Sequence, residues 1–153
     1  MEKPILVFKR FGHQIQLMVQ KEAKRFGIEF MGGPQGQVLR FLDQREDLQQ
    51  VTLIKDIEQE LKISKSVASN LVKRMVQNGL VKLESSPTDK RAKFVRLTDK
   101  SRSKMQEIKS FFERIDQSLL AGIAEKDLAV FEQVLNQLKE NVKKIGGENE
   151  ETR

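Results

Sequence analysis

Residues 54–98 read IKDIEQELKISKSVASNLVKRMVQNGLVKLESSPTDKRAKFVRLT, and the order of elements within this stretch decides the fold. Apolar residues in its first part recur at steps of three and four, which predicts a short helix over 54–61 and a second helix over 64–78. The connection Lys62-Ile63 is tight, so the two helices form a helix-turn-helix, and Ser64 can cap the second one. The inward face of that helix is expected to hold Val67, Leu71, Val72 and Met75.

After Asn78-Gly79, where a helix can end, the apolar period changes from 3.6 to 2. Residues 80–84 and 93–97 alternate apolar and polar side chains, and residues 85–89 have the composition of a turn. This predicts a two-stranded hairpin whose inward side holds Val81, Leu83, Val95 and Leu97. Residues 51–53 are β-prone but long enough only for a third strand stub. The expected class is therefore mainly α, a winged helix-turn-helix with a two-stranded β wing.

Helical patterns also flank this lobe, at residues 5–26, from residue 99 onward and from about residue 125 to 145. A short helix over 36–44 is expected after the break at Gly32-Gly33-Pro34. The stripe of the helix after Asp99 is expected to hold Met105, Ile108, Phe112, Ile115 and Leu119. The last helix has a regular apolar seam formed by Leu128, Phe131, Leu135, Leu138, Val142 and Ile145.

These stripes exceed what a small lobe can cover, so they predict either a dimer interface or an intramolecular bundle. We expect a single domain over residues 1–153. It would comprise a winged lobe over 51–98, dimerisation helices over 5–26 and 99–145, and a polar, disordered tail over 146–153.

Positive charge is concentrated in the winged lobe. Residues 55–96 hold ten Lys/Arg and five Asp/Glu, and so carry +5 of the chain's formal charge of +6. Such a concentration attracts a polyanion and supplies affinity that does not depend on sequence. Charge alone would equally suit a solvated basic face, and the order of the elements favours contact with DNA.

A helix that enters the major groove needs small, polar or basic side chains on its outer face. On the second helix the predicted base or phosphate contacts are Ser64, Lys65, Ser66, Ser69, Asn70, Lys73 and Arg74. On the hairpin they are Asp89, Lys90, Arg91 and Lys93. Arg91 is expected to enter the minor groove, with Asp89 holding its guanidinium through a charge-assisted pair. The plainer alternatives are a capped amphipathic helix with a solvated face and a solvated turn.

The composition excludes several functions. With no cysteine and one histidine, His13, the chain has neither a thiol switch nor the ligands for a multi-histidine zinc site, and His13 is expected to be solvated. We find no phosphate-binding glycine loop and no nucleophile elbow, so we predict neither an enzyme nor a cofactor. No run of 18 apolar residues is present, and Lys9 and Arg10 interrupt the N-terminal apolar cluster. We therefore expect no membrane span, no signal peptide and a cytoplasmic protein.

The order and spacing of these pieces resemble the MarR-type regulators over about residues 5–145. The residues that carry the resemblance are Asp56 through Leu61, Ile63 through Val81, Asp89-Lys90-Arg91 and Val95-Arg96-Leu97-Thr98. It implies a homodimer that presents two winged lobes to a palindromic operator, with half-sites about one helical turn apart. Arg91 would be the minor-groove residue, Asp89 its partner, and the helix over 64–78 the reader.

The resemblance also implies a small aromatic effector bound between the dimer region and the DNA lobe, although no residue of the sequence identifies its pocket. Ser101 stands where such proteins often have glycine. The expected function is a sequence-specific regulator of transcription that binds double-stranded DNA, a repressor rather than an activator. The alternative is a winged-helix protein–protein adaptor, or a protein that binds nucleic acid without sequence preference.

Overall fold

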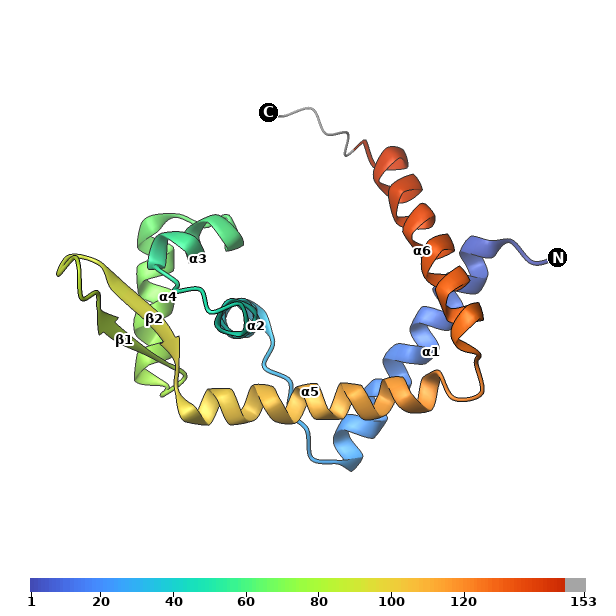
Figure 1. The fold of residues 1–153 in the computed structure, drawn as a ribbon, viewed down its shortest axis with the longest axis horizontal. Coiled ribbons are helices and arrows are strands. Elements are labelled where there is room, and N and C mark those ends of the chain that lie inside the picture. The colour runs from blue at the N-terminus through green and yellow to red at the C-terminus, as the bar shows by residue number, and fades with distance from the viewer. Residues whose placement is uncertain (148–153) are drawn as a thin grey trace. The chain divides into compact units, whose positions relative to one another are not determined.

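The structure is a computed structural model that describes residues 1–147, and this part of the chain is mainly helical with a two-stranded antiparallel sheet (Figure 1). The elements are α1 Pro4–Arg25, α2 Gly33–Asp47, α3 Ile54–Leu61, α4 Lys65–Gln77, β1 Val81–Ser85, β2 Lys93–Leu97, α5 Asp99–Leu119 and α6 Glu125–Ile145. This order confirms the predicted winged helix-turn-helix class. Most of the predicted tail, residues 148–153, lies outside the described residues. None of the helices described is long and apolar enough to cross a membrane.

The chain divides into two compact units, Met1–Ile115 and Asp116–Arg153. The first unit contains α1 to β2 and most of α5. The second contains the last residues of α5 together with α6. Each unit is described by itself.

The core of the first unit lies where α2, the α3–α4 pair, the hairpin and the start of α5 meet. In Figure 1, α2 is seen end-on between the helix pair and α5. The core residues are Val38, Leu39, Leu42, Ile57, Leu71, Val72, Met75, Leu80, Val81, Val95, Leu97 and Met105. They come from every element of the lobe, so burial of this cluster fixes α4 and the hairpin together as one rigid piece.

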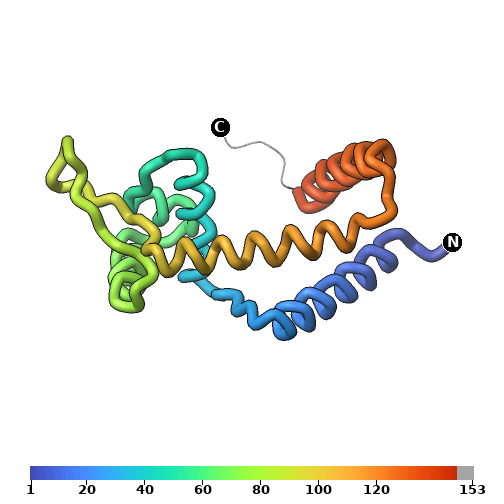
Figure 2. The backbone as a smooth tube through the Cα atoms, turned by 60° about the horizontal axis from the view of Figure 1, so that its bottom comes forward, coloured from blue at the N-terminus to red at the C-terminus, as the bar shows by residue number. Residues whose placement is uncertain are grey.

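The hairpin has the predicted register, with Val81 opposite Leu97 and Leu83 opposite Val95. Figure 2 shows it projecting from the lobe. Leu83 was expected to face inward, but 40% of it is exposed. It lies two residues closer to the tip than Val81, on a strand with no neighbour on its other side, so the core does not reach it. The predicted strand stub is a single bridge between Leu53 and Phe94.

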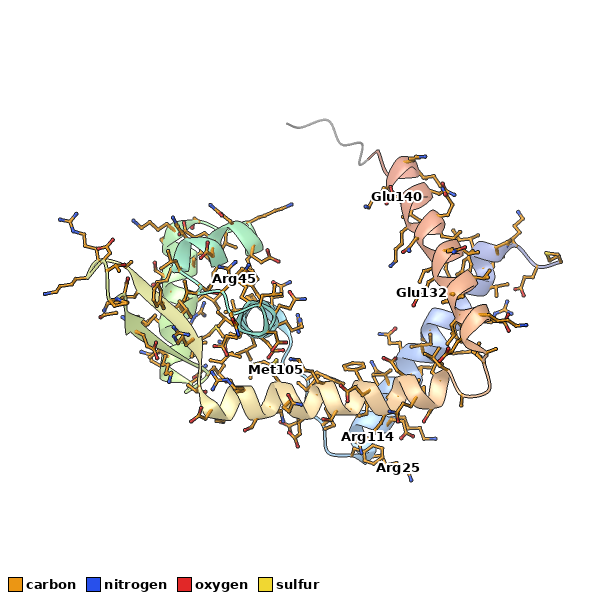
Figure 3. All side chains as sticks on the ribbon, viewed as in Figure 1. Arg25, Arg45, Met105, Arg114, Glu132 and Glu140 are labelled. Atoms are coloured by element: carbon orange, nitrogen blue, oxygen red, sulfur yellow. The ribbon has the colours of Figure 1, made fainter. Side chains whose placement is uncertain are left out.

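Helix α2 continues past the predicted end at residue 44 as far as Asp47. Its last turn contains no apolar residue, and polar contacts to other elements hold it instead. Arg45, labelled in Figure 3, donates from Nε to Thr52 Oγ1 at 2.8 Å. Lys109 of α5 pairs with Asp43 and Asp47 at 2.8 and 2.9 Å, and hydrogen bonds to these two carboxylates raise its pKa.

A second cluster joins the C-terminal half of α1 to α5 within the first unit. It consists of Ala23, Ile28 and Phe111, with Val19, Ile108 and Ile115 packed against it. Phe111 is 1% exposed, whereas Phe112, which was expected in the stripe, is 40% exposed. Either neighbour fits steps of three or four after Ile108, and packing on Ala23 and Ile28 selects Phe111.

Candidate nucleic-acid interface

The ends of α4 are held by specific backbone geometry and hydrogen bonds, of which the sequence predicted the Ser64 cap. Lys62 takes a left-handed conformation with φ of 54°, which allows the tight connection between α3 and α4. Ser64 is the N-cap of α4, and its Oγ accepts the backbone N–H of Val67 at 3.3 Å. The far end of α4 is tied to α2 by a hydrogen bond from Asn78 to Gln35 at 3.5 Å. The helix is thus fixed at both ends before any partner binds.

The buried side of α4 consists of Ala68, Leu71, Val72 and Met75. All seven residues predicted to contact DNA from this helix are exposed, namely Ser64, Lys65, Ser66, Ser69, Asn70, Lys73 and Arg74. Val67 was expected to face inward, and this is wrong, because half of it (50%) is exposed. The stripe is centred on Ala68 rather than on Val67, and a small alanine gives a weak apolar signal in the sequence.

Two further residues of α4 share the exposed surface with the predicted contacts. Gln77 lies four positions after Lys73 and seven after Asn70, and this spacing places it on the same helix stripe. Val67 lies at the edge of that stripe. Helical spacing from Asn70 would have found Gln77 in the sequence. The exposure of Val67 follows from packing and has no signal of its own.

The tip of the hairpin is built around a buried serine. Ser86 is 7% exposed, and its Oγ accepts the backbone N–H groups of Thr88 and Asp89, each at 3.3 Å. The backbone N–H of Ala92 then donates to the carbonyl oxygen of Asp89 at 3.1 Å, and that of Ser86 to the carbonyl oxygen of Ala92 at 3.0 Å. These bonds close the loop, and Asp89, Lys90, Arg91 and Lys93 are all exposed around it.

Asp89 contacts Arg91 in a different way from the one expected. Its Oδ1 accepts the backbone N–H of Arg91 at 2.9 Å. The ion pairs among the described residues do not include one between Asp89 and the guanidinium. In this structure Asp89 therefore sets the backbone of the tip and leaves the guanidinium of Arg91 unpaired.

Charge pairing separates the predicted contacts from the two basic residues on the body of the hairpin. On the body of the hairpin, Glu84 pairs with both Lys82 and Arg96. The predicted basic contacts form no ion pair with any described residue; they are Lys65, Lys73, Arg74, Lys90, Arg91 and Lys93. Lys55 of α3 and Lys62 in the turn after it are also exposed and form no ion pair within the described part of the chain, so the free positive charge of the lobe lies on the helix pair and the hairpin tip.

A cavity of about 520 Å³ lies on another part of the first unit. The segment between α1 and α2, the helix α2 and the first turns of α5 line it, chiefly through Phe30, Met31, Leu39, Leu80 and Met105. Ser101 also lines it, is 2% exposed, and has an Oγ without a hydrogen-bond partner among the described residues. Ser101 therefore places a buried, unpaired hydroxyl beside the cavity, an arrangement that is unfavourable in the free chain.

The capped α4 with its polar outer face, the helix that supports it and the basic hairpin together define a winged helix-turn-helix protein. Known proteins place the chain within that class. The MarR family model matches residues 26–92. The transcriptional regulator HosA of Escherichia coli O111:H- is 26% identical over 129 residues, which cover 82% of this chain and 92% of HosA.

Two solved structures have the same fold. The heme sensor protein PefR from Streptococcus agalactiae, in complex with heme, is 34% identical and covers 99% of this chain and 100% of its own, with a TM-score of 0.62. A mutant of Staphylococcus aureus MepR, bound to an oligodeoxyribonucleotide, is 18% identical. The match covers 93% of this chain and 99% of the MepR chain, with a TM-score of 0.60. The chain belongs to the MarR family of transcriptional regulators, which are not enzymes.

Proposed function

We propose that this protein is a homodimeric repressor that binds a palindromic operator in double-stranded DNA and releases it when a small aromatic effector binds. The observation that carries the DNA-binding part is the contrast in charge pairing. Lys82 and Arg96 share the one carboxylate of Glu84, whereas the predicted basic contacts on α4 and the hairpin tip form no ion pair with any described residue and are free to contact phosphates.

The proposed geometry follows from the two protruding elements. Helix α4 enters the major groove, where Ser66 and Asn70 reach base edges and Lys73 contacts the phosphate backbone. The hairpin tip reaches the neighbouring minor groove, where Arg91 finds the strongest negative potential. Blocking a promoter requires nothing beyond such binding, which favours a repressor over an activator.

The dimer is supported by apolar surface that this chain leaves open. In α1, Phe8 and Phe11 are 52% and 49% exposed. In α6, which has no buried residue, Phe131 and Val142 are 57% and 67% exposed. Apolar residues that recur along helices and remain this open are typical of interfaces. A two-fold dimer presents two copies of α4, which requires a palindromic operator.

Selection from random duplexes tests the proposal. The purified protein is incubated with the pool at about 0.15 M salt, where non-specific affinity is already reduced, and bound DNA is sequenced. We expect enrichment of one palindrome. Recovery of DNA without enrichment would support non-specific binding instead. No recovery at all would support the adaptor role.

The cavity supports the effector part of the proposal. Its lining is chiefly apolar, which suits an aromatic ring, and the free Oγ of Ser101 suits a hydroxyl or carbonyl group on that ring. The charged residues of the lining are balanced, with Lys100 and Lys104 against Glu29 and Glu107. Charge therefore contributes less to ligand selection here than shape and one hydrogen bond.

Heme, which PefR binds, does not fit the residues of this cavity. Proteins hold heme iron through histidine, cysteinate or tyrosinate, or through methionine together with histidine. The chain has no cysteine or tyrosine, and its one histidine, His13, is exposed on α1 and is not part of the lining. We therefore propose that the effector of this cavity is bound without a metal.

The effector part is tested by Ser101→Ala. Removing the unpaired hydroxyl should raise the melting temperature of the free protein, by the equivalent of about 1 kcal/mol. It should also weaken binding of hydroxybenzoates, measured by their release of operator DNA. Ser110→Ala, at an exposed position of α5 outside the lining, is the control for the helix preference of alanine and should leave effector binding unchanged. Equal effects of the two variants would contradict the role of Ser101.

A further inference from the structure

In the first turns of α4, Val67 stands out because it is an apolar residue that is exposed to solvent. It is the third residue of the helix, it is 50% exposed, and the exposed residues around it are polar or basic. From Ser64 to Arg74 it is the only exposed apolar side chain. Isolated exposed valines are common on protein surfaces, so the position of this one within the proposed interface is what matters.

We infer that Val67 determines specificity by packing against the methyl group of a thymine in the major groove. This inference rests on the proposed function, since it requires that α4 reads a defined operator. The N-terminal residues of a recognition helix are the ones that approach base edges. Val67 lies in that turn, one helical turn before Asn70.

The chemistry of the groove leaves one partner for an aliphatic side chain. The major-groove edges of guanine, adenine and cytosine present hydrogen-bond donors and acceptors, and thymine alone adds a methyl group. Valine can neither donate nor accept. Placed over any other edge it would strip water from a polar group without replacing the hydrogen bond. Val67 therefore favours thymine both by apolar contact and by rejecting the other bases.

The structure also holds Val67 ready for this contact. Its backbone N–H is bound to Ser64 Oγ at 3.3 Å, and the next residue, Ala68, is 0% exposed in the core. The side chain is β-branched and has one strongly preferred rotamer in a helix. Little freedom is lost when it contacts a base, in contrast to the long side chains of Lys65 and Lys73.

The test removes single methyl groups from the DNA. In the operator obtained by selection, each thymine of a half-site is replaced in turn by uracil, which lacks the methyl group but keeps the same hydrogen-bonding pattern. We expect one replacement per half-site to weaken binding by the wild-type protein about fourfold, the effect of leaving one methyl-sized group unburied. Val67→Ala should bind the thymine operator more weakly by a similar factor and should no longer distinguish thymine from uracil.

Val76→Ala is the matched control. Val76 is also exposed (39%) but lies near the C-terminal end of α4, so this variant should keep the full thymine preference. If no uracil replacement weakens wild-type binding, or if Val67→Ala keeps the preference, the inference is wrong while the proposed function stands. If selection enriches no operator, the proposed function fails and the inference fails with it.

Discussion

At the scale of single residues, the hairpin tip is shaped by two side chains that bond to its backbone. Ser86 Oγ receives two backbone N–H groups, and Asp89 Oδ1 receives that of Arg91. The tip is therefore formed in the free protein, and the guanidinium of Arg91 is the part that remains free to turn toward a partner. In the proposed complex with DNA, Asp89 therefore places the backbone of Arg91 and does not pair with its guanidinium.

Arg91→Ala should weaken operator binding by about 1–3 kcal/mol, as the loss of a good specific contact does. Fluorescence anisotropy titration of the operator at constant salt measures the change. Asp89→Asn is the control, because an asparagine oxygen can still accept the backbone N–H of Arg91, and its affinity should stay close to that of the wild type. Unchanged affinity of Arg91→Ala would show that the tip does not contact DNA. If Asp89→Asn lost as much operator affinity as Arg91→Ala, the originally expected pair between the Asp89 carboxylate and the Arg91 guanidinium would be supported instead.

Gly36 is a second residue whose identity the structure explains. A Cβ atom added there would lie 1.9 Å from the carbonyl oxygen of Met31, so the segment that lines the cavity can approach α2 only over a glycine. Gly36→Ala should destabilise the protein by about 1–3 kcal/mol, the usual effect of overpacking. Urea denaturation measures this. In Gly12→Ala, where nothing lies within 4 Å, the change should instead stabilise α1 by about 0.5–1 kcal/mol.

Single residues are also where sequence periodicity was least accurate. It identified most of the core, including Leu71, Met75 and Val95, because these follow regular steps, whereas the Ser64 cap was predicted from the hydrogen bonding of serine at a helix start. It misplaced Val67 and Leu83, which fit the steps but lie at the edge of a stripe and near the tip of an edge strand. Position relative to the core decides such cases, and that is a property of the assembled fold.

At the scale of elements, Glu46 joins three of them. From the last turn of α2 its Oε1 accepts the backbone N–H of Leu97 at the end of β2, at 3.1 Å. Its Oε2 pairs with Arg102 of α5 at 3.0 Å, and this hydrogen bond raises the pKa of Arg102. The partners lie 51 and 56 residues away in the chain, so sequence periodicity could not indicate them, and the predicted α2 ended too early.

Glu46→Ala should destabilise the protein by about 1–3 kcal/mol, because the N–H of Leu97 and the guanidinium of Arg102 both lose their acceptor. Glu46→Gln should lie between this variant and the wild type, since the amide oxygen can still accept the N–H of Leu97. Thermal unfolding followed by circular dichroism measures both. Asp99→Asn, which removes a fully exposed carboxylate that pairs with Arg102 from the first turn of α5, should change stability much less than Glu46→Ala. If Glu46→Ala changed stability as little as Asp99→Asn, the contacts of Glu46 with Leu97 and Arg102 would not hold α2, β2 and α5 together.

At the scale of the whole molecule, polar and apolar surfaces serve different proposed contacts. The basic residues predicted to contact DNA are exposed on α4 and the hairpin, while large exposed apolar residues recur along α1 and α6. The sequence predicted both surfaces from charge and periodicity. It could not choose between a bundle and a dimer for the apolar seams. Helix α6 has no buried residue, and we propose that a second copy of the chain covers its seam.

Phe131→Glu should therefore convert the protein from dimer to monomer, because it places a charge in the apolar seam of α6, where the wild-type ring is 57% exposed. Size-exclusion chromatography with light scattering at micromolar concentration measures the mass. Glu132→Gln, a change at the adjacent exposed position, should remain dimeric. The Phe131→Glu variant should also bind the full palindrome no more tightly than a single half-site, since each monomer carries one α4 and one hairpin. If the wild-type protein is a monomer at this concentration, the proposed dimer is wrong. A monomeric Phe131→Glu that still prefers the full palindrome would show that the two lobes meet through the DNA and not through α6.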